Sequence, residues 1–152
     1  MKKLLLTLVG ICASISAFAI TPFVEFQPVI AGGNTCRFNV QGGIHEMMTK
    51  NIGLGAGLGI TEQWNFETGP LIPIFVRGDI NGKMGGFNPF FSFDLGYAIN
   101  TENTDFGAVV VNPMVGLNFG KVYAGIGYQA LCWTHKGAGA SNCFNLKIGY
   151  NF

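Results

Sequence analysis

Apolar side chains occupy every second position of the segment that ends the sequence, residues 143–152. The apolar positions are Phe144, Leu146, Ile148, Tyr150 and Phe152. Successive side chains of a β-strand point to opposite faces, so this pattern predicts a strand with one fully apolar face. No further segment follows Phe152 to cover that face, and we therefore expect acyl chains to cover it.

A second alternating segment lies in the interior of the sequence, at residues 52–64. Its apolar positions are Ile52, Leu54, Ala56, Leu58 and Ile60, and they alternate with Gly53, Gly55, Gly57 and Gly59. A helix would lose about 0.8–1.0 kcal/mol at each glycine relative to alanine. In a strand, bare positions leave space for large side chains from neighbouring strands, and Phe75 and Arg77 are long enough to use it. A phosphate-binding loop is excluded because the GxxxxGK[ST] pattern is missing.

Eight segments of the chain alternate in this way. They span residues 23–31, 36–48, 52–64, 71–81, 87–99, 106–119, 122–131 and 143–152. The connections alternate between loops of roughly four to nine residues and turns of about two to four, as in barrels with both termini at one end. The sequence therefore predicts an all-β fold, an eight-stranded antiparallel up-and-down transmembrane β-barrel. Each segment is long enough to span, since a tilted strand needs about 9–11 residues.

The first 19 residues have the pattern of a cleaved signal peptide. Lys2 and Lys3 precede an apolar run, residues 4–12, and a small-x-small cleavage site follows at residues 17–19. The run is shorter than the about 20 residues of a spanning helix. A lipoprotein signal with lipidated Cys12 is the alternative, but Ile11 stands where a small residue is required. We expect residues 1–19 to be removed and residues 20–152 to form the barrel domain.

The composition supports an envelope protein without a nucleic-acid partner. The sequence is 49% hydrophobic and 11% charged, against about 25% charged in ordinary soluble domains. Nine basic residues less Lys2 and Lys3 leave seven, against eight acidic residues, so the mature chain has a net charge of −1. Such a chain has no basic field for nucleic acid.

Six charged residues fall on the face opposite the apolar one, which a membrane barrel turns inward. They are Glu25, Arg37, Arg77, Asp79, Asp94 and Lys147. Unpaired charges there are costly, so we expect ion pairs, with hydrogen bonds from Asn39, Gln41, Asn112, Asn118, Gln129 and Asn145. An eight-stranded barrel has room only for side chains or one small ligand. This predicts a side-chain-filled lumen and no open pore; a narrow ion or proton path through it is an open alternative.

The histidines give no catalytic or metal site by their spacing. His45 falls on the inward face, and His135 falls in the last loop, six residues before Ser141. A hydrolase needs a nucleophile beside its base, and a zinc site needs further ligands at regular spacing. We expect no catalytic residues, no metal site and no cofactor. A lipid-modifying enzyme using His135 at the barrel rim is a less favoured alternative.

Three cysteines, Cys36, Cys132 and Cys143, fall at the predicted outer ends of strands. An exported protein meets an oxidising environment in which disulfides persist. Cys132 and Cys143 flank the last predicted hairpin loop, residues 132–140. We expect a Cys132–Cys143 disulfide that closes this loop.

Three segments carry a resemblance to a known family. Residues 89–97 (PFFSFDLGY), 111–117 (VNPMVGL) and 149–152 (GYNF) resemble the small outer-membrane β-barrel proteins of Bacteroides-type bacteria. Their architecture is similar to that of the eight-stranded OmpA/OmpX barrels. The resemblance implies location in the cell outer membrane, contact with its lipid, and recognition of the closing strand by the barrel-insertion machinery. We also expect the chain to be a monomer.

These observations favour an integral outer-membrane β-barrel with a structural or surface-interaction role and no enzymatic activity. The alternative is a secreted soluble barrel, similar to lipocalins, that binds a small apolar ligand inside. The two differ in which face is apolar. In the soluble barrel Leu54, Ile74 and Ile148 would line a shared interior, and the charged face would meet solvent.

Overall fold

The computed structural model describes residues 20–32, 38–62, 69–102, 107–134 and 139–152. The predicted signal peptide, residues 1–19, lies outside the described residues, as do Cys36, Arg37 and His135. Within the described ranges, no helix is long and apolar enough to cross a membrane.

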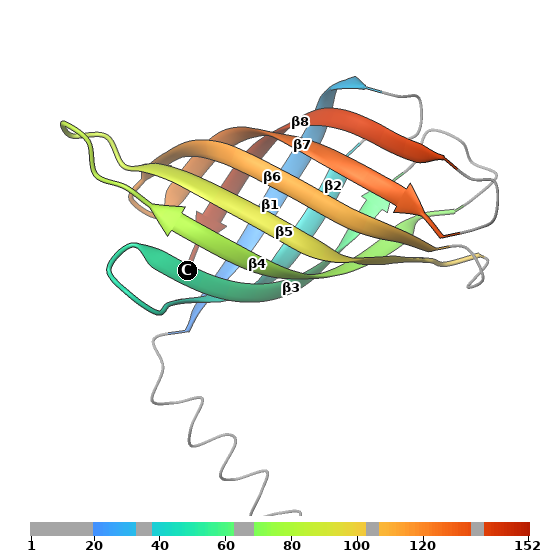
Figure 1. Cartoon of the computed structure of the whole chain (residues 1–152). Helices are drawn as coiled ribbons and strands as arrows, with labels where there is room; N and C mark the ends of the chain where they lie inside the picture. Colours follow the sequence, from blue (N-terminus) through green and yellow to red (C-terminus); the bar gives the residue numbers. More distant parts are fainter. Residues whose placement is uncertain (1–19, 33–37, 63–68, 103–106, 135–138) are drawn as a thin grey trace, which may run out of the picture.

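Eight antiparallel strands close into a barrel, with each strand beside its neighbours in sequence and β1 beside β8 (Figure 1). The strands are β1 (Thr21–Gly32), β2 (Phe38–Met47), β3 (Ile52–Glu62), β4 (Leu71–Asn81), β5 (Pro89–Asn100), β6 (Gly107–Phe119), β7 (Val122–Trp133) and β8 (Ala140–Asn151). The predicted up-and-down barrel is therefore confirmed. The largest difference is in the last hairpin, where β7 and β8 continue their ladder into the predicted loop, to the pair Cys132–Ala140.

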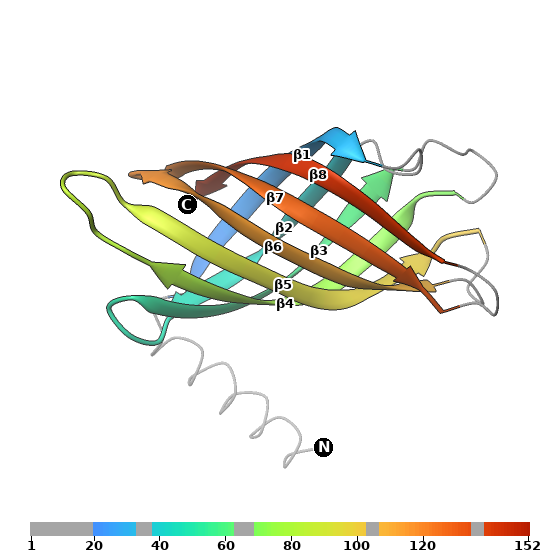
Figure 2. The same ribbon diagram turned by 45° about the horizontal axis from the view of Figure 1, so that its top comes forward.

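The two ends of the barrel differ in their connections (Figures 1 and 2). We call one end the turn end. It carries the start of β1, the end of β8 and the connections β2–β3, β4–β5 and β6–β7. Gly120 in the β6–β7 turn has a φ of +71°, a conformation that favours glycine. The opposite end, with the connections β1–β2, β3–β4, β5–β6 and β7–β8, is the loop end.

The apolar faces of the strands point outward. Leu54, Ile74 and Ile148 expose 55%, 54% and 52% of their surface, whereas the polar side chains of the other face are buried. This orientation is the one predicted for a membrane barrel. It contradicts the lipocalin-like alternative, because those aliphatic side chains do not share an interior.

The glycine face of β3 is filled by side chains from β2 and β4, as predicted. A Cβ on Gly57 would lie 2.6 Å from Phe75 Cζ and 2.7 Å from the carbonyl oxygen of Gly42. Further toward the turn end, Gly55 pairs with both His45 and Arg77, and Gly53 pairs with both Met47 and Asp79. Bare positions on β3 thus allow side chains of β2 and β4 to meet inside the barrel.

Candidate functional site

The lumen is divided into layers by the chemistry of its inward side chains. The charged tier consists of Glu25, Arg77, Ser92, Asp94, Tyr123 and Lys147. The amide tier consists of Gln27, Asn39, Gln41, Asn112, Gln129 and Asn145. The apolar plug consists of Leu71, Ala98, Ala108, Val110, Leu131 and Cys143. Positions along β1, β4 and β8 place the charged tier nearest the turn end and the plug nearest the loop end.

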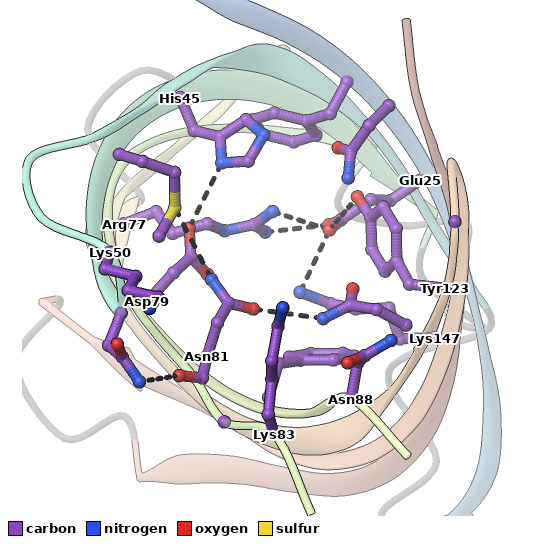
Figure 3. Close-up of a pocket in the computed structure, with 18 residues that line it drawn as sticks. Glu25, His45, Lys50, Arg77, Asp79, Asn81, Lys83, Asn88, Tyr123 and Lys147 are labelled. Carbon is purple, nitrogen blue, oxygen red and sulfur yellow. Dashed lines mark hydrogen bonds and ion pairs between the residues drawn. The ribbon is translucent and has the colours of Figure 1, made fainter. Parts of the chain in front are cut away.

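A cavity of about 690 Å³, which we call the vestibule, lies at the turn end of the lumen (Figure 3). Its floor is formed by members of the charged tier, and its wall by His45, Asp79 and residues of the three turns. Neither the amide tier nor the plug contributes to its lining. Buried side chains of the amide tier and the plug occupy the middle and the loop end of the described lumen, but the lumen is hollow at the turn end, where complete filling was predicted.

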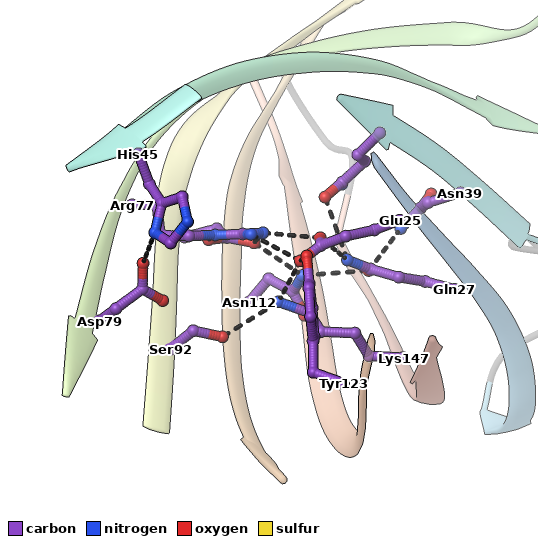
Figure 4. Close-up of polar contacts among 12 residues, drawn as sticks. Glu25, Gln27, Asn39, His45, Arg77, Asp79, Ser92, Asn112, Tyr123 and Lys147 are labelled. Atoms are coloured by element: carbon purple, nitrogen blue, oxygen red, sulfur yellow. Dashed lines mark hydrogen bonds and ion pairs between the residues drawn. The ribbon is translucent and has the colours of Figure 1, made fainter. Parts of the chain in front are cut away.

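Arg77 is the centre of the charged tier and binds two carboxylates with its planar fork (Figure 4). Its Nη1 and Nη2 donate to Glu25 Oε1 and Oε2 at 2.6 and 2.7 Å. Its Nε and Nη2 donate to Asp94 Oδ1 and Oδ2 at 2.6 and 2.8 Å. Two bidentate pairs fix both the position and the plane of the guanidinium. The Phe23 ring lies against it, with 4.4 Å from Cζ to the ring centroid.

Lys147 and Tyr123 complete the coordination of Glu25. Lys147 Nζ lies 3.0 Å from Glu25 Oε1 and donates to Ser92 Oγ at 3.0 Å. Tyr123 donates its hydroxyl hydrogen to Glu25 Oε1 at 2.7 Å. The tier contains two acidic and two basic side chains, so its charges balance, and all four are almost fully buried. Balanced, hydrogen-bonded charges are the condition under which burial of ions is tolerated.

Gln27 connects the charged tier to the amide tier. Its Nε2 donates to Glu25 Oε2 and to Gln41 Oε1, each at 3.0 Å. Its Oε1 accepts hydrogen bonds from Asn39, Asn112 and Asn145 at 3.4, 3.2 and 3.3 Å. Asn112 also donates to Asp94 at 3.3 Å. The side chains of the charged tier and the amide tier therefore form one network that joins seven strands, β1, β2 and β4 to β8.

The predicted inward charges are confirmed wherever the structure describes them. Glu25, Arg77, Asp94 and Lys147 form the charged tier, and Asp79 lies at the vestibule wall. Asn39, Gln41, Asn112, Gln129 and Asn145 belong to the amide tier as expected, whereas Asn118 lies nearer the turn end and donates to Asn81. Sequence reasoning missed the hydrogen bonds of Tyr123 and Gln27. Their inward positions were the available signal, but apart from the contact of Gln27 with Glu25 within β1 their partners lie on other strands.

The predicted Cys132–Cys143 disulfide is wrong. Cys132 pairs with Ala140, and Cys143 pairs with Gln129, so the two cysteines are three positions apart along the ladder. An odd separation places them on opposite faces of the barrel wall. Cys132 is exposed, Cys143 is buried in the plug, and no disulfide joins them. Continuation of the strands into the predicted loop is the physical reason for the error.

No catalytic arrangement is evident among the described residues. His45 Nδ1 lies 3.7 Å from Asp79 Oδ2 in the vestibule wall, and its Nε2 has no hydrogen-bond partner among the described residues. Among the same residues, no group of three or more His, Cys, Asp and Glu side chains could hold a metal ion. His135 lies outside the described ranges, so the expectation about a rim enzyme stays a prediction.

The closed barrel is similar to two solved structures. One is the N-terminal β-barrel domain of Pseudomonas aeruginosa OprF, with a TM-score of 0.57, 13% identity, and coverage of 88% of this chain and 96% of that chain. The other comes from the de novo design of transmembrane β-barrels, with a TM-score of 0.51, 14% identity, and coverage of 88% and 94%. At these identities the similarity concerns the fold. No protein-family model and no curated protein sequence matches the chain.

Proposed function

We propose that this chain is an integral protein of the cell outer membrane with a structural or surface-interaction role, and that its lumen is closed to ions. Membership of the small Bacteroides-type family is part of the proposal and depends on the motifs at residues 89–97 and 111–117. The observation that carries the proposal is the apolar belt around the barrel.

Every strand contributes exposed apolar side chains to this belt. One example from each strand in turn is Phe26, Ile44, Leu58, Ile74, Leu95, Val115, Ile126 and Ile148. Soluble proteins rarely expose contiguous apolar patches larger than a few hundred Å². An apolar outer band with a polar interior is the arrangement of outer-membrane barrels. The similarity to a designed transmembrane barrel agrees with this interpretation.

The contents of the lumen support a closed barrel. The acidic and basic side chains of the charged tier neutralise one another, and toward the loop end the described lumen is occupied by the apolar plug, with the buried side chains of Thr61 and Asn100 beside Leu71 in the ladders. Dehydrating an ion to pass such a plug is unfavourable. A water-filled channel is typical of barrels with many more strands.

The proposed partners follow from the same belt and from the closing strand. Outer-membrane lipid covers the belt. The barrel-insertion machinery recognises β8, whose exposed outward residues are Phe144, Leu146, Ile148 and Tyr150. We further propose that the chain is a monomer, binds no nucleic acid and catalyses no reaction.

Fractionation and planar-bilayer recordings test the proposal. The protein is expected in the detergent extract of outer membranes, with a gel mobility that changes on heating, and in bilayers it is expected to give no conductance steps. Recovery in an aqueous wash without detergent would overturn the membrane assignment. Reproducible conductance from correctly folded protein would overturn the closed lumen alone. Activity on outer-leaflet lipids that is lost in His135→Ala would instead favour the rim enzyme.

A further inference from the structure

Four side chains with metal-binding atoms meet in the vestibule wall, outside the charged tier. His45 and Met47 come from β2, and Asp79 and Asn81 come from β4. Between them β3 presents only Gly53 and Gly55, which pair with residues of both strands. In Figure 3 the labelled side chains of His45, Asp79 and Asn81 point toward the vestibule.

The distance between His45 and Asp79 fits a bridging ion better than a direct hydrogen bond. Nδ1 lies 3.7 Å from Oδ2, beyond the 2.7–3.2 Å range of a typical N–H···O bond. Two ligands at that separation, each about 2.1 Å from one ion, subtend an angle of about 120° at it, within the range of a tetrahedral or trigonal site. Asp79 Oδ2 is one of six buried side-chain polar atoms that lack a hydrogen-bond partner among the described residues; His45 Nε2, the imidazole nitrogen other than the one nearest Asp79, is another, and the remaining four belong to the amide tier. Buried polar atoms normally have such a partner.

The thioether of Met47 lies beside this pair. A point at the Cβ position of Gly53 is 3.0 Å from Met47 Sδ and 3.6 Å from Asp79 Cβ. Asn81 Nδ2 donates to the same sulfur at 3.5 Å. The Phe23 ring packs edge-on against the imidazole of His45, with centroids 6.0 Å apart. Met47 Sδ and Asp79 Cβ thus flank the same bare position of β3, and His45, Met47 and Asp79 all line the vestibule.

We propose that His45, Asp79 and Met47 form a binding site for a copper ion. Imidazole nitrogen binds zinc, copper, iron and nickel, and a thioether selects Cu(I) and zinc, so copper and zinc are the ions common to both donor types. We assign copper because zinc sites are built from Cys, His, Asp and Glu side chains, whereas Cu(I) favours the soft thioether of methionine. Sequence spacing did not reveal this site, because the ligands come from two strands and one of them is a methionine.

The local charges are compatible with a cation. In the described lumen, Asp79 is the carboxylate without an ion pair to arginine or lysine, while Glu25 and Asp94 neutralise Arg77 and Lys147. Lys50 and Lys83 line the mouth of the vestibule, but both are exposed to solvent. Water and salt screen such exposed charges strongly.

The test is a copper titration of the folded chain in detergent micelles. The probes are Cu(I) in competition with a chromophoric chelator and, separately, Cu(II). We expect one equivalent to bind, with affinity at least about tenfold weaker in His45→Gln and in Asp79→Asn. Met47→Leu is expected to weaken binding of Cu(I) by about tenfold and that of Cu(II) by less, because the thioether prefers the soft ion.

Matched controls use the other histidine and the neighbouring methionine. His135→Gln and Met48→Leu remove the same donor types elsewhere, since Met48 follows β2 and is exposed. Neither is expected to change copper affinity. Heat-modifiable mobility shows that each variant is folded. The proposal is overturned if the folded wild-type chain binds no copper, or if His45→Gln binds it as tightly as wild type. Either result leaves the membrane assignment unaffected, because fractionation tests that separately.

Discussion

The charged tier and the apolar plug occupy the same lumen but are stabilised by different interactions. In the charged tier, Arg77, Lys147 and Tyr123 all converge on Glu25 through bonds of 2.6–3.0 Å. In the plug, Leu71, Val110 and Leu131 pack without directed bonds between them. Both regions are almost fully buried, so the contrast does not come from exposure to solvent.

The difference shows where the barrel is sensitive to substitution. Removing one member of a buried ion network leaves its partners charged and unpaired, which costs more than the lost bond itself. Removing carbon atoms from an apolar cluster costs the transfer free energy and the cavity that remains. The charged tier should therefore fail as a unit, whereas the plug should weaken in proportion to the volume removed.

The largest effect is expected from Glu25→Ala. The variant leaves Arg77 and Lys147 with one carboxylate between them and leaves the Tyr123 hydroxyl without its acceptor. Loss of one partner from a buried ion pair costs about 3–5 kcal/mol. Urea unfolding of the refolded barrel, followed by its heat-modifiable gel mobility, measures the free energy of unfolding.

A double variant tests whether the tier acts as a unit. Glu25→Gln combined with Lys147→Met removes one charge of each sign, so it is expected to be less destabilised than the sum of the two single variants. Simple additivity of the two single effects would contradict the contrast between the charged tier and the plug.

Leu131→Ala is the corresponding change in the plug. Leu131 is fully buried in this cluster, and truncation of such a leucine costs about 2–5 kcal/mol. The amide tier separates it from Glu25. We therefore expect the effects of Leu131→Ala and Glu25→Ala to add within about 0.5 kcal/mol in the same unfolding assay. A coupling well above that value would mean that the two regions are not independent.

A smaller effect is expected from Gly57→Ala, which tests the space between β2 and β4. The new Cβ would meet Phe75 Cζ at 2.6 Å and a backbone oxygen at 2.7 Å. Overpacking of this kind costs about 1–3 kcal/mol. The matched control is Gly78→Ala on β4, where a Cβ meets nothing within 4 Å. Its unfolding free energy should stay within about 0.5 kcal/mol of wild type. Equal effects at Gly57 and Gly78 would show that strand propensity, and not the filled lumen, sets the cost.

Much of the fold could be predicted from the sequence because alternation with period two determines which face each residue occupies. The bare face of β3 even indicated that Phe75 would enter the space beside Gly57. The stagger of the strands around the barrel cannot be predicted from the sequence of any one segment. For that reason the sequence placed Tyr123 inside but not against Glu25, which lies 98 positions away.

The same limit explains the errors at strand ends. Residues 132–140 were predicted to form a loop, but the ladder of β7 and β8 continues to Cys132 and Ala140. Two more residues of strand were enough to fix Cys132 on the outer face. The donors in the vestibule wall were missed for a related reason, since His45 and Asp79 meet only across the bare positions of β3.

The smallest change in unfolding free energy is expected when either cysteine is replaced by serine. Cys143 lies in the plug and Cys132 on the outer surface of the same hairpin, so the two variants compare these regions. Cys143→Ser places a hydroxyl at the border of the apolar plug, where Gln129 O and Oε1 lie 3.7 Å from the sulfur and can accept a hydrogen bond, so it should cost no more than about 1 kcal/mol of unfolding free energy. Cys132→Ser changes an exposed position and should stay within about 0.5 kcal/mol of the wild-type unfolding free energy.

A membrane-permeant maleimide, with labelled peptides identified by mass spectrometry, should modify Cys132 in the folded barrel and Cys143 only after unfolding. Protection of both thiols until a reductant is added, with Cys132 and Cys143 recovered in one disulfide-linked pair of peptides and Cys36 labelled, would restore the predicted disulfide.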